Sequence, residues 1–145
     1  MICLIQRALA GQVTIAGETV GRIDHGMVVL VGFQPQDTQV ALEKMAHKLL
    51  HYRLFSDEKQ KMNLNVQQVS GSILLVPQFT LAANTQSGLR PSFSSCAPPS
   101  EAEQMFQKFL GIMNHRYGLV ESGVFGADMQ VSLINDGPVT FWLQT

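Results

Sequence analysis

The pattern of apolar and polar positions predicts that β-strands dominate the first quarter of the chain. Strands are expected at Ile2 to Gln6 and at Val13 to Ile15, and Glu18 to Ile23 follows the hairpin-like dipeptide Ala16-Gly17. The segment Met27 to Phe33 is continuously apolar and rich in β-branched residues. Such a run is typical of a strand that is buried on both faces, so we expect it at the centre of a sheet.

Two later segments show the spacing of apolar residues that is typical of an amphipathic helix. The first is expected to have Asp37 as its N-cap and to run to about Tyr52. The second begins with Ser100-Glu101-Ala102-Glu103, a capping-box pattern, and extends to about Tyr117. Gly118 follows as a C-terminal cap.

The remaining apolar runs predict further strands, which are expected at Ser72 to Leu81, Val120 to Val124, Met129 to Ile134 and Val139 to Leu143. Pro77 cannot donate a ladder hydrogen bond and so marks an edge, a bulge or a strand end. Asn135 to Pro138 is expected to turn the chain between the last two strands. Because strands and helices do not alternate strictly, the sequence favours a mixed α+β fold over a doubly wound sheet.

The composition is that of a globular protein, and we expect a single domain over residues 1–145. Hydrophobic residues make up 46% of the chain and charged residues 14%, against roughly 25% charged residues in an average soluble domain. Such a low charge content is compatible with a surface buried against a second copy of the chain. The net charge of −1 argues against DNA or non-specific nucleic-acid binding, so any RNA contact should be local.

Targeting and redox features point to a soluble cytoplasmic protein. No run approaches the ~18 apolar residues of a membrane span, and the first residues lack the pattern of a signal peptide. The two cysteines, Cys3 and Cys96, have no short spacing, which indicates a reducing compartment and no disulfide framework.

Conventional catalytic and cofactor motifs are absent. The chain has no GxSxG, no phosphate-binding loop and no GxGxxG, and we expect no cofactor. His47 and His51 have the i, i+4 spacing of metal ligands, but the HExxH pattern and a third ligand are missing, so we expect no metal. Cys96 precedes a helix and is a weak candidate for a reactive thiol, whereas Cys3 is expected to be buried.

Two segments far apart in the sequence are the best candidates for chemistry. Gln78 to Leu81 follows a strand and a proline, and its backbone N–H groups could form an oxyanion hole to which Thr80 adds a hydroxyl. Asn135 to Thr140 contains Gly137-Pro138, which could be an ordinary β-turn or a cis pair whose carbonyls screen a ligand by stereochemistry. Taken alone, each segment favours a purely structural role.

The two segments occur together with six others in a specific order and at specific distances. In chain order the eight are Ile5 to Arg7, Gly26 to Gly32, Arg53 to Asp57, Lys61 to Val66, Gln78 to Ala82, Arg90 to Phe93, Phe125 to Met129 and Asn135 to Trp142. In this arrangement the chain resembles the D-aminoacyl-tRNA deacylase family nearly from end to end.

The resemblance implies the fold, the activity and the partners. The fold would be deacylase-like, a mostly antiparallel, barrel-like sheet with two main helices. The protein would be a homodimer that hydrolyses the ester between a D-amino acid and the 3′ end of tRNA, and that also removes glycine from mischarged tRNA(Ala). It would bind aminoacyl-tRNA and neither DNA nor a membrane.

The resemblance also assigns roles to residues of the first segment. Gln78, Phe79 and Thr80 would line the catalytic pocket. The family usually has Ser where this chain has Pro77, so the pocket geometry or the rate could differ. Thr80 could act as a nucleophile, but no His or carboxylate is evident to activate it, and we favour activation of water by the substrate's 2′-OH.

Further roles concern chiral selection and binding of the tRNA end. Gly137 and Pro138 would enter the pocket of the partner subunit and reject L-amino acids, and Arg7 would hold their loop. Phe125 and Met129 would bracket the terminal adenosine. Two alternatives remain open, a non-enzymatic β-rich binding module and a general esterase that acts without RNA.

Overall fold

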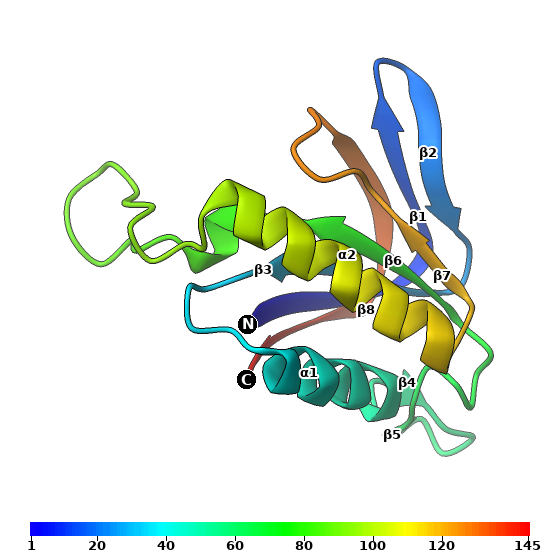
Figure 1. The fold of residues 1–145 in the computed structure, drawn as a ribbon. Helices are drawn as coiled ribbons and strands as arrows, with labels where there is room; N and C mark the ends of the chain where they lie inside the picture. The colour runs from blue at the N-terminus through cyan, green and yellow to red at the C-terminus, as the bar shows by residue number, and fades with distance from the viewer.

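The computed structural model describes residues 1–145, which form a twisted sheet with two helices packed against one face (Figure 1). The elements, in chain order, are β1 (Ile2–Ile15), β2 (Glu18–Ile23), β3 (Gly26–Gly32), α1 (Gln39–His51), β4 (Phe55–Ser56), β5 (Met62–Leu64), β6 (Ser72–Pro77), the short 3-10 helix η1 (Phe79–Ala82), α2 (Pro99–Arg116), β7 (Val120–Ser122) and β8 (Gln130–Gln144). The expected α+β class with two main helices is confirmed. Neither helix combines the length and the apolar character that a membrane span requires.

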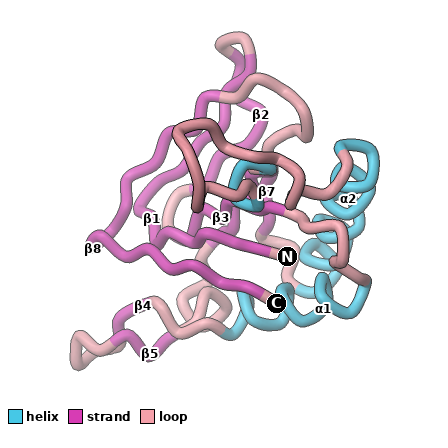
Figure 2. Tube along the Cα trace, turned by 90° about the vertical axis from the view of Figure 1, so that its left-hand side faces the viewer, coloured by secondary structure: helices cyan, strands magenta, loops and turns pink.

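The main sheet has the strand order β2-β1-β3-β6-β7, and β8 pairs with β1 along most of its length (Figure 2). The pairs β1–β2, β1–β3 and β1–β8 are antiparallel, whereas β3–β6 and β6–β7 are parallel. The sheet curls until β2 meets β7, where a Cβ added to Gly21 would lie 2.7 Å from the Ser122 carbonyl oxygen. The fold is therefore a nearly closed barrel, as expected.

Two hydrophobic cores lie on opposite faces of the central strands. In β3, Met27, Val29 and Val31 join the larger core under the helices, while Val28 joins the smaller core on the other face. The alternation is the same in β6, where Ile73 and Leu75 belong to the larger core and Leu74 and Val76 to the smaller one. Because successive side chains point to opposite faces, burial on both faces requires the continuous apolar runs seen in the sequence.

The predicted starts of both helices are wrong. Thr38, not Asp37, is the N-cap of α1, and its hydroxyl accepts from the Ala41 N–H. The helix α2 begins at Pro99 with Pro98 as N-cap, so the capping-box pattern at Ser100 does not cap it. Proline suits the first helical turn because its missing N–H would have no acceptor there.

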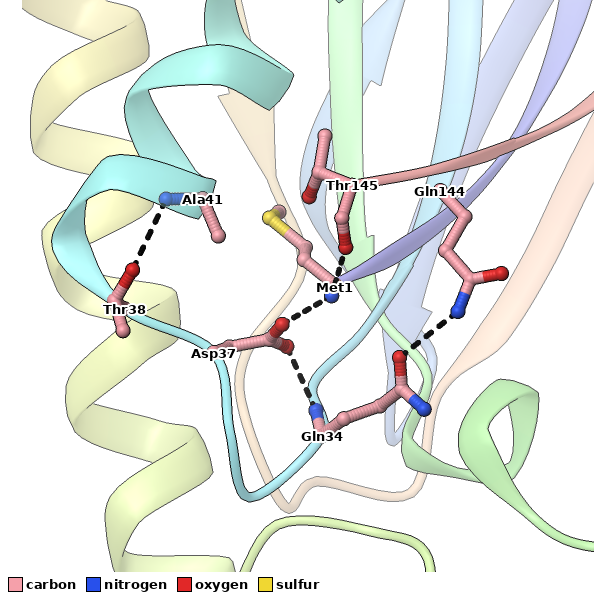
Figure 3. Close-up of polar contacts among 7 residues, drawn as sticks. All are labelled: Met1, Gln34, Asp37, Thr38, Ala41, Gln144 and Thr145. Atoms are coloured by element: carbon pink, nitrogen blue, oxygen red, sulfur yellow. Dashed lines mark hydrogen bonds and ion pairs between the residues drawn. The ribbon is translucent and has the colours of Figure 1, made fainter.

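Asp37 instead binds the amino group of Met1 (Figure 3). One carboxylate oxygen pairs with this amino group, and the other accepts from the Gln34 N–H at 2.7 Å. The amino group also donates to the carbonyl of Thr145 at 3.3 Å, so Met1 joins Thr145 to Asp37. Asp37 therefore pairs with a charged amino group 36 residues away in the sequence and does not cap the helix.

Three predicted strand boundaries also differ. Residues 2–15 form one long strand in place of two short ones, because β1 pairs with β3 and β2 in succession along one edge and with β8 along the other. The strand predicted to reach Leu81 ends at Pro77, and β7 is shorter than expected. Gly118, with φ of +81°, follows the C-terminus of α2 as expected.

Candidate active site

The segment Gln78 to Leu81 leaves the sheet at the end of β6. The Gln78 N–H donates to the Val31 carbonyl at 2.7 Å, and the chain then turns into η1. The N–H groups of Phe79 and Thr80 open this short helix, and the first N–H groups of a helix have no acceptor within it. Gly32 of β3 packs closely against the segment, since an added Cβ would lie 3.0 Å from the Gln78 carbonyl oxygen.

Thr80 has no base beside it. Its hydroxyl oxygen accepts a short hydrogen bond from the Gln78 side-chain amide, and this is its one hydrogen bond to a side chain. An amide N–H donor cannot remove a proton from a hydroxyl. The geometry therefore supplies no group that would convert Thr80 into a nucleophile.

Cys96 lies close to this segment but is not an activated thiol. Its Sγ is 3.4 Å from the Phe79 carbonyl oxygen, to which the thiol donates. Desolvation raises the pKa of Cys96, and burial raises the pKa of Cys3 even further. Both sulfurs are thus thiols at neutral pH, which argues against the reactive-thiol hypothesis for Cys96.

A cavity of about 430 Å³ lies beside Gln78 and Phe79. Its wall also contains Phe125 and Met129 from the segment before β8, so four of the predicted site residues are brought together. The rest of the wall comes from the end of β6, the region around the start of α2, and the chain that leads into β8. These residues are Val76, Pro77, Ala97, Pro99, Ala102, Gly126, Ala127, Asp128 and Val131. Asp128 is the one charged side chain in this apolar wall.

Thr80 faces a second, more open cavity of about 540 Å³, which it shares with Leu81 and Trp142. Residues of the segment Gln78 to Leu81 therefore line two different cavities. Phe79 is about half exposed, at 51%, and its ring lies 5.3 Å from that of Phe93. This exposed aromatic pair stands next to the candidate oxyanion donors.

Gly137 and Pro138 line neither cavity. The predicted turn at Asn135 to Pro138 is wrong, because the chain does not reverse there and both halves of β8 pair with β1. Gln6 faces Thr140 and Ala8 faces Asn135, so four residues, 136 to 139, bulge out opposite Arg7 alone. The Gly137–Pro138 peptide bond is cis.

Arg7 lies against this bulge from the β1 side. Its Nε donates to the Asp136 carbonyl at 3.1 Å and lies 3.0 Å from Oδ2 of the same residue. Its Nη1 donates to the Leu54 carbonyl at 2.9 Å. The guanidinium thus joins the bulge to the segment between α1 and β4.

Sequence reasoning gave no role to Asn135, although it named the segment. The Asn135 Oδ1 accepts from the Val139 N–H at 2.7 Å, and its Nδ2 donates to the Thr140 hydroxyl at 2.9 Å. Asparagine side chains often bond to nearby backbone N–H groups, and this tendency could have predicted the role of Asn135. The wall residues from the start of α2 carried no such signal.

No three His, Cys, Asp or Glu side chains are grouped as a metal ion would require. His47 and His51 stack on α1 with ring centroids 4.2 Å apart, and His51 Nδ1 bonds to the His47 carbonyl at 2.8 Å. The two rings therefore stack on each other, and His51 bonds to the helix backbone.

Comparisons with known proteins agree over nearly the whole chain. The sequence is 60% identical to a D-aminoacyl-tRNA deacylase of Hydrogenovibrio crunogenus and 59% identical to one of Marinomonas sp.; the first match covers 100% of both chains and the second 99%. The solved structure of the c-Myc DNA Unwinding Element Binding Protein superimposes with a TM-score of 0.96 at 38% identity, covering 100% of this chain and 99% of that one. A structure described as "a probable eukaryotic D-amino acid tRNA deacylase" shares the fold, with a TM-score of 0.89 at 17% identity over 99% of this chain and 98% of the other. The sequence model of the D-Tyr-tRNA(Tyr) deacylase family matches residues 4–144, and the chain therefore belongs to that family.

Proposed function

We propose that this protein hydrolyses the ester bond of D-aminoacyl-tRNA to give the free amino acid and tRNA. The observation that carries the proposal is the cavity in which Gln78 and Phe79 face Phe125 and Met129, in a chain that matches curated deacylases over its full length. Because its substrate belongs to translation, the protein would work in the cytoplasm. Glycyl-tRNA(Ala) would be a second substrate, since glycine carries no side chain.

The proposed chemistry relies on backbone donors. An aminoacyl ester is already activated, so its hydrolysis needs little more than stabilisation of the negative oxygen in the transition state. The N–H groups of Phe79 and Thr80 are the candidate donors, and one such donor is typically worth about 3–4 kcal/mol. The neighbouring 2′-OH of the terminal ribose would activate the attacking water, because no base lies beside Thr80.

Chiral selection would come from a second copy of the chain. In a homodimer, Gly137 and Pro138 of one subunit would enter the cavity of the other, where their carbonyl groups would collide with an L side chain. Their exposure, and their absence from the cavity walls of their own chain, support this arrangement. Arg7 would hold the bulge in place through its bonds to Asp136 and Leu54.

The adenosine at the end of tRNA would bind between Phe125 and Met129. An aromatic ring and a polarisable thioether both suit the face of a purine. Gly123 leaves room for this arrangement, since an added Cβ would lie only 2.7 Å from the Met129 sulfur.

The proposed activity predicts rapid release of tyrosine from D-Tyr-tRNA and little release from L-Tyr-tRNA. The measurement is the ratio of kcat/KM for the two substrates, with D-tyrosine ethyl ester as a substrate that lacks RNA. Hydrolysis of the simple ester as fast as D-Tyr-tRNA would support a general esterase instead. Binding of tRNA without any hydrolysis would support a non-enzymatic binding module.

The Thr80→Ala variant distinguishes the two proposed routes. We expect its kcat for D-Tyr-tRNA to fall by less than about ten-fold, since the variant loses a hydroxyl but keeps the backbone donors. Single-turnover release of labelled D-tyrosine measures the effect, with the melting temperature as a check on folding. A complete loss in a folded variant would instead favour Thr80 as a covalent nucleophile.

A further inference from the structure

We propose that Asn135 is a positioning residue for chiral selection, acting by closing the base of the bulge that presents Gly137 and Pro138. This inference rests on the proposed function, because it assigns Asn135 to the same stereochemical filter. Asn135 itself would touch neither the substrate nor the reacting atoms.

The bulge interrupts the ladder between β1 and β8. Residues 136 to 139 have only Arg7 opposite them, so the regular hydrogen bonds between the strands are lost at this point. An insertion of this size in a strand needs other contacts to fix its shape, and the N–H of Val139 in particular needs an acceptor, because Val139 is buried. The inserted residues are also the ones whose carbonyls would face the substrate.

The Asn135 side chain supplies the missing contacts at the base of the insertion. Its Oδ1 accepts from the Val139 N–H at 2.7 Å, and its Nδ2 donates to the Thr140 Oγ1 at 2.9 Å. Asn135 is the last paired residue before the bulge, and Thr140 is the first paired residue after it. One amide therefore ties the two ends of the bulge together.

The two supports of the bulge are independent and act on different atoms. Arg7 holds the first half through the Asp136 carbonyl and carboxylate, at 3.1 and 3.0 Å. Asn135 holds the second half through Val139 and Thr140. With either support removed, the carbonyls of Gly137 and Pro138 would lose a fixed direction, and an L side chain could be accommodated.

The geometry requires a side chain that bonds to both the Val139 N–H and the Thr140 hydroxyl. An amide offers an acceptor to the Val139 N–H and a donor to the Thr140 hydroxyl at the same time. Aspartate keeps the acceptor, and the Thr140 hydroxyl can rotate to donate to its second oxygen. Alanine provides neither contact.

The test compares Asn135→Ala with Asn135→Asp by the ratio of kcat/KM for D-Tyr-tRNA over L-Tyr-tRNA. We expect the ratio to fall at least ten-fold in Asn135→Ala and to be largely restored in Asn135→Asp. Asn114→Ala, on the exposed face of α2, is the matched control and should keep the wild-type ratio. A change in stability alone would lower both kcat/KM values equally and leave their ratio unchanged.

Two outcomes overturn the inference, and a third overturns the proposed function instead. A folded Asn135→Ala variant with the wild-type ratio overturns it. If Asn135→Ala does not fold, Asn135→Leu takes its place, since leucine keeps the size of the side chain but makes neither hydrogen bond, and an unchanged ratio in that variant overturns the inference in the same way. A wild-type protein without preference for D over L would instead overturn the proposed function itself, which separates the two failures.

Discussion

Replacing Gly137 with alanine is expected to lower the ratio of kcat/KM for D-Tyr-tRNA over L-Tyr-tRNA by roughly 10²-fold, because it would displace the carbonyls that reject an L side chain. Gly137 has φ of +133°, a backbone conformation that residues with a side chain rarely adopt. An added Cβ would also lie 2.7 Å from Cγ2 of Val139 and 3.2 Å from Nη2 of Arg7. Neither neighbour can move freely, since Val139 is bonded to Asn135 and Arg7 to Asp136.

Gly17→Ala provides the matched control for this variant. Gly17 also has a positive φ, +86°, but an added Cβ would meet no atom within 4 Å. Both variants place a side chain at a positive φ, and only Gly137→Ala adds crowding at the proposed filter. Deacylation of D-Tyr-tRNA and L-Tyr-tRNA by the two variants gives the comparison. Equal, small losses in both would contradict the proposed role of Gly137.

The strands buried on both faces were the part of the fold that the sequence predicted best. The unbroken apolar runs in β3 and β6 follow from their position between two cores, and a half-exposed strand would instead show polar residues at every second position. The long strand β1 was harder to predict. The pattern of its polar and apolar residues changes at the point where its neighbouring strand changes from β3 to β2, so the sequence predicted two strands.

The turn predicted at Asn135 to Pro138 is wrong for a physical reason, which applies to any prediction made from neighbouring residues alone. Asn, Asp, Gly and Pro favour a tight turn, and a large bulge needs the same backbone conformations. The pairing of Gln6 with Thr140 and of Ala8 with Asn135 decides between these structures. That pairing joins residues from opposite ends of the chain, and no local pattern contains it.

The candidate site was predicted only in part, because contacts between residues distant in the sequence complete it. Gln78, Phe79, Phe125 and Met129 carry recognisable motifs, and the fold brings them to one cavity. Pro99 and Ala102 complete the wall only because α2 begins beside the end of β6, and their sequence carries no chemical signal. The support that Asn135 gives to the bulge likewise depends on which residues the bulge places within its reach.

Asp37→Asn is expected to reduce the free energy of unfolding by about 3–5 kcal/mol, the usual cost of leaving one member of a buried ion pair alone. Met1 is fully buried, and the Asp37 side chain is 3% exposed. Asparagine cannot replace the carboxylate, because Asp37 accepts from two donors, the amino group and the Gln34 N–H. The amide NH₂ of asparagine would have to face one of these donors. Urea unfolding at neutral pH measures the loss.

Asp24→Asn serves as the control, because Asp24 also pairs with a cation but does so in water. Its partner Arg22 lies 3.7 Å away, and the two side chains are 87% and 68% exposed. Exposed pairs of this kind contribute about 0–1 kcal/mol, so this variant should unfold close to the wild-type urea concentration. Since total stabilities of such domains are about 5–15 kcal/mol, the loss expected for Asp37→Asn is a large fraction of the whole. Equal losses in the two variants would mean that burial gives the terminal ion pair no special weight.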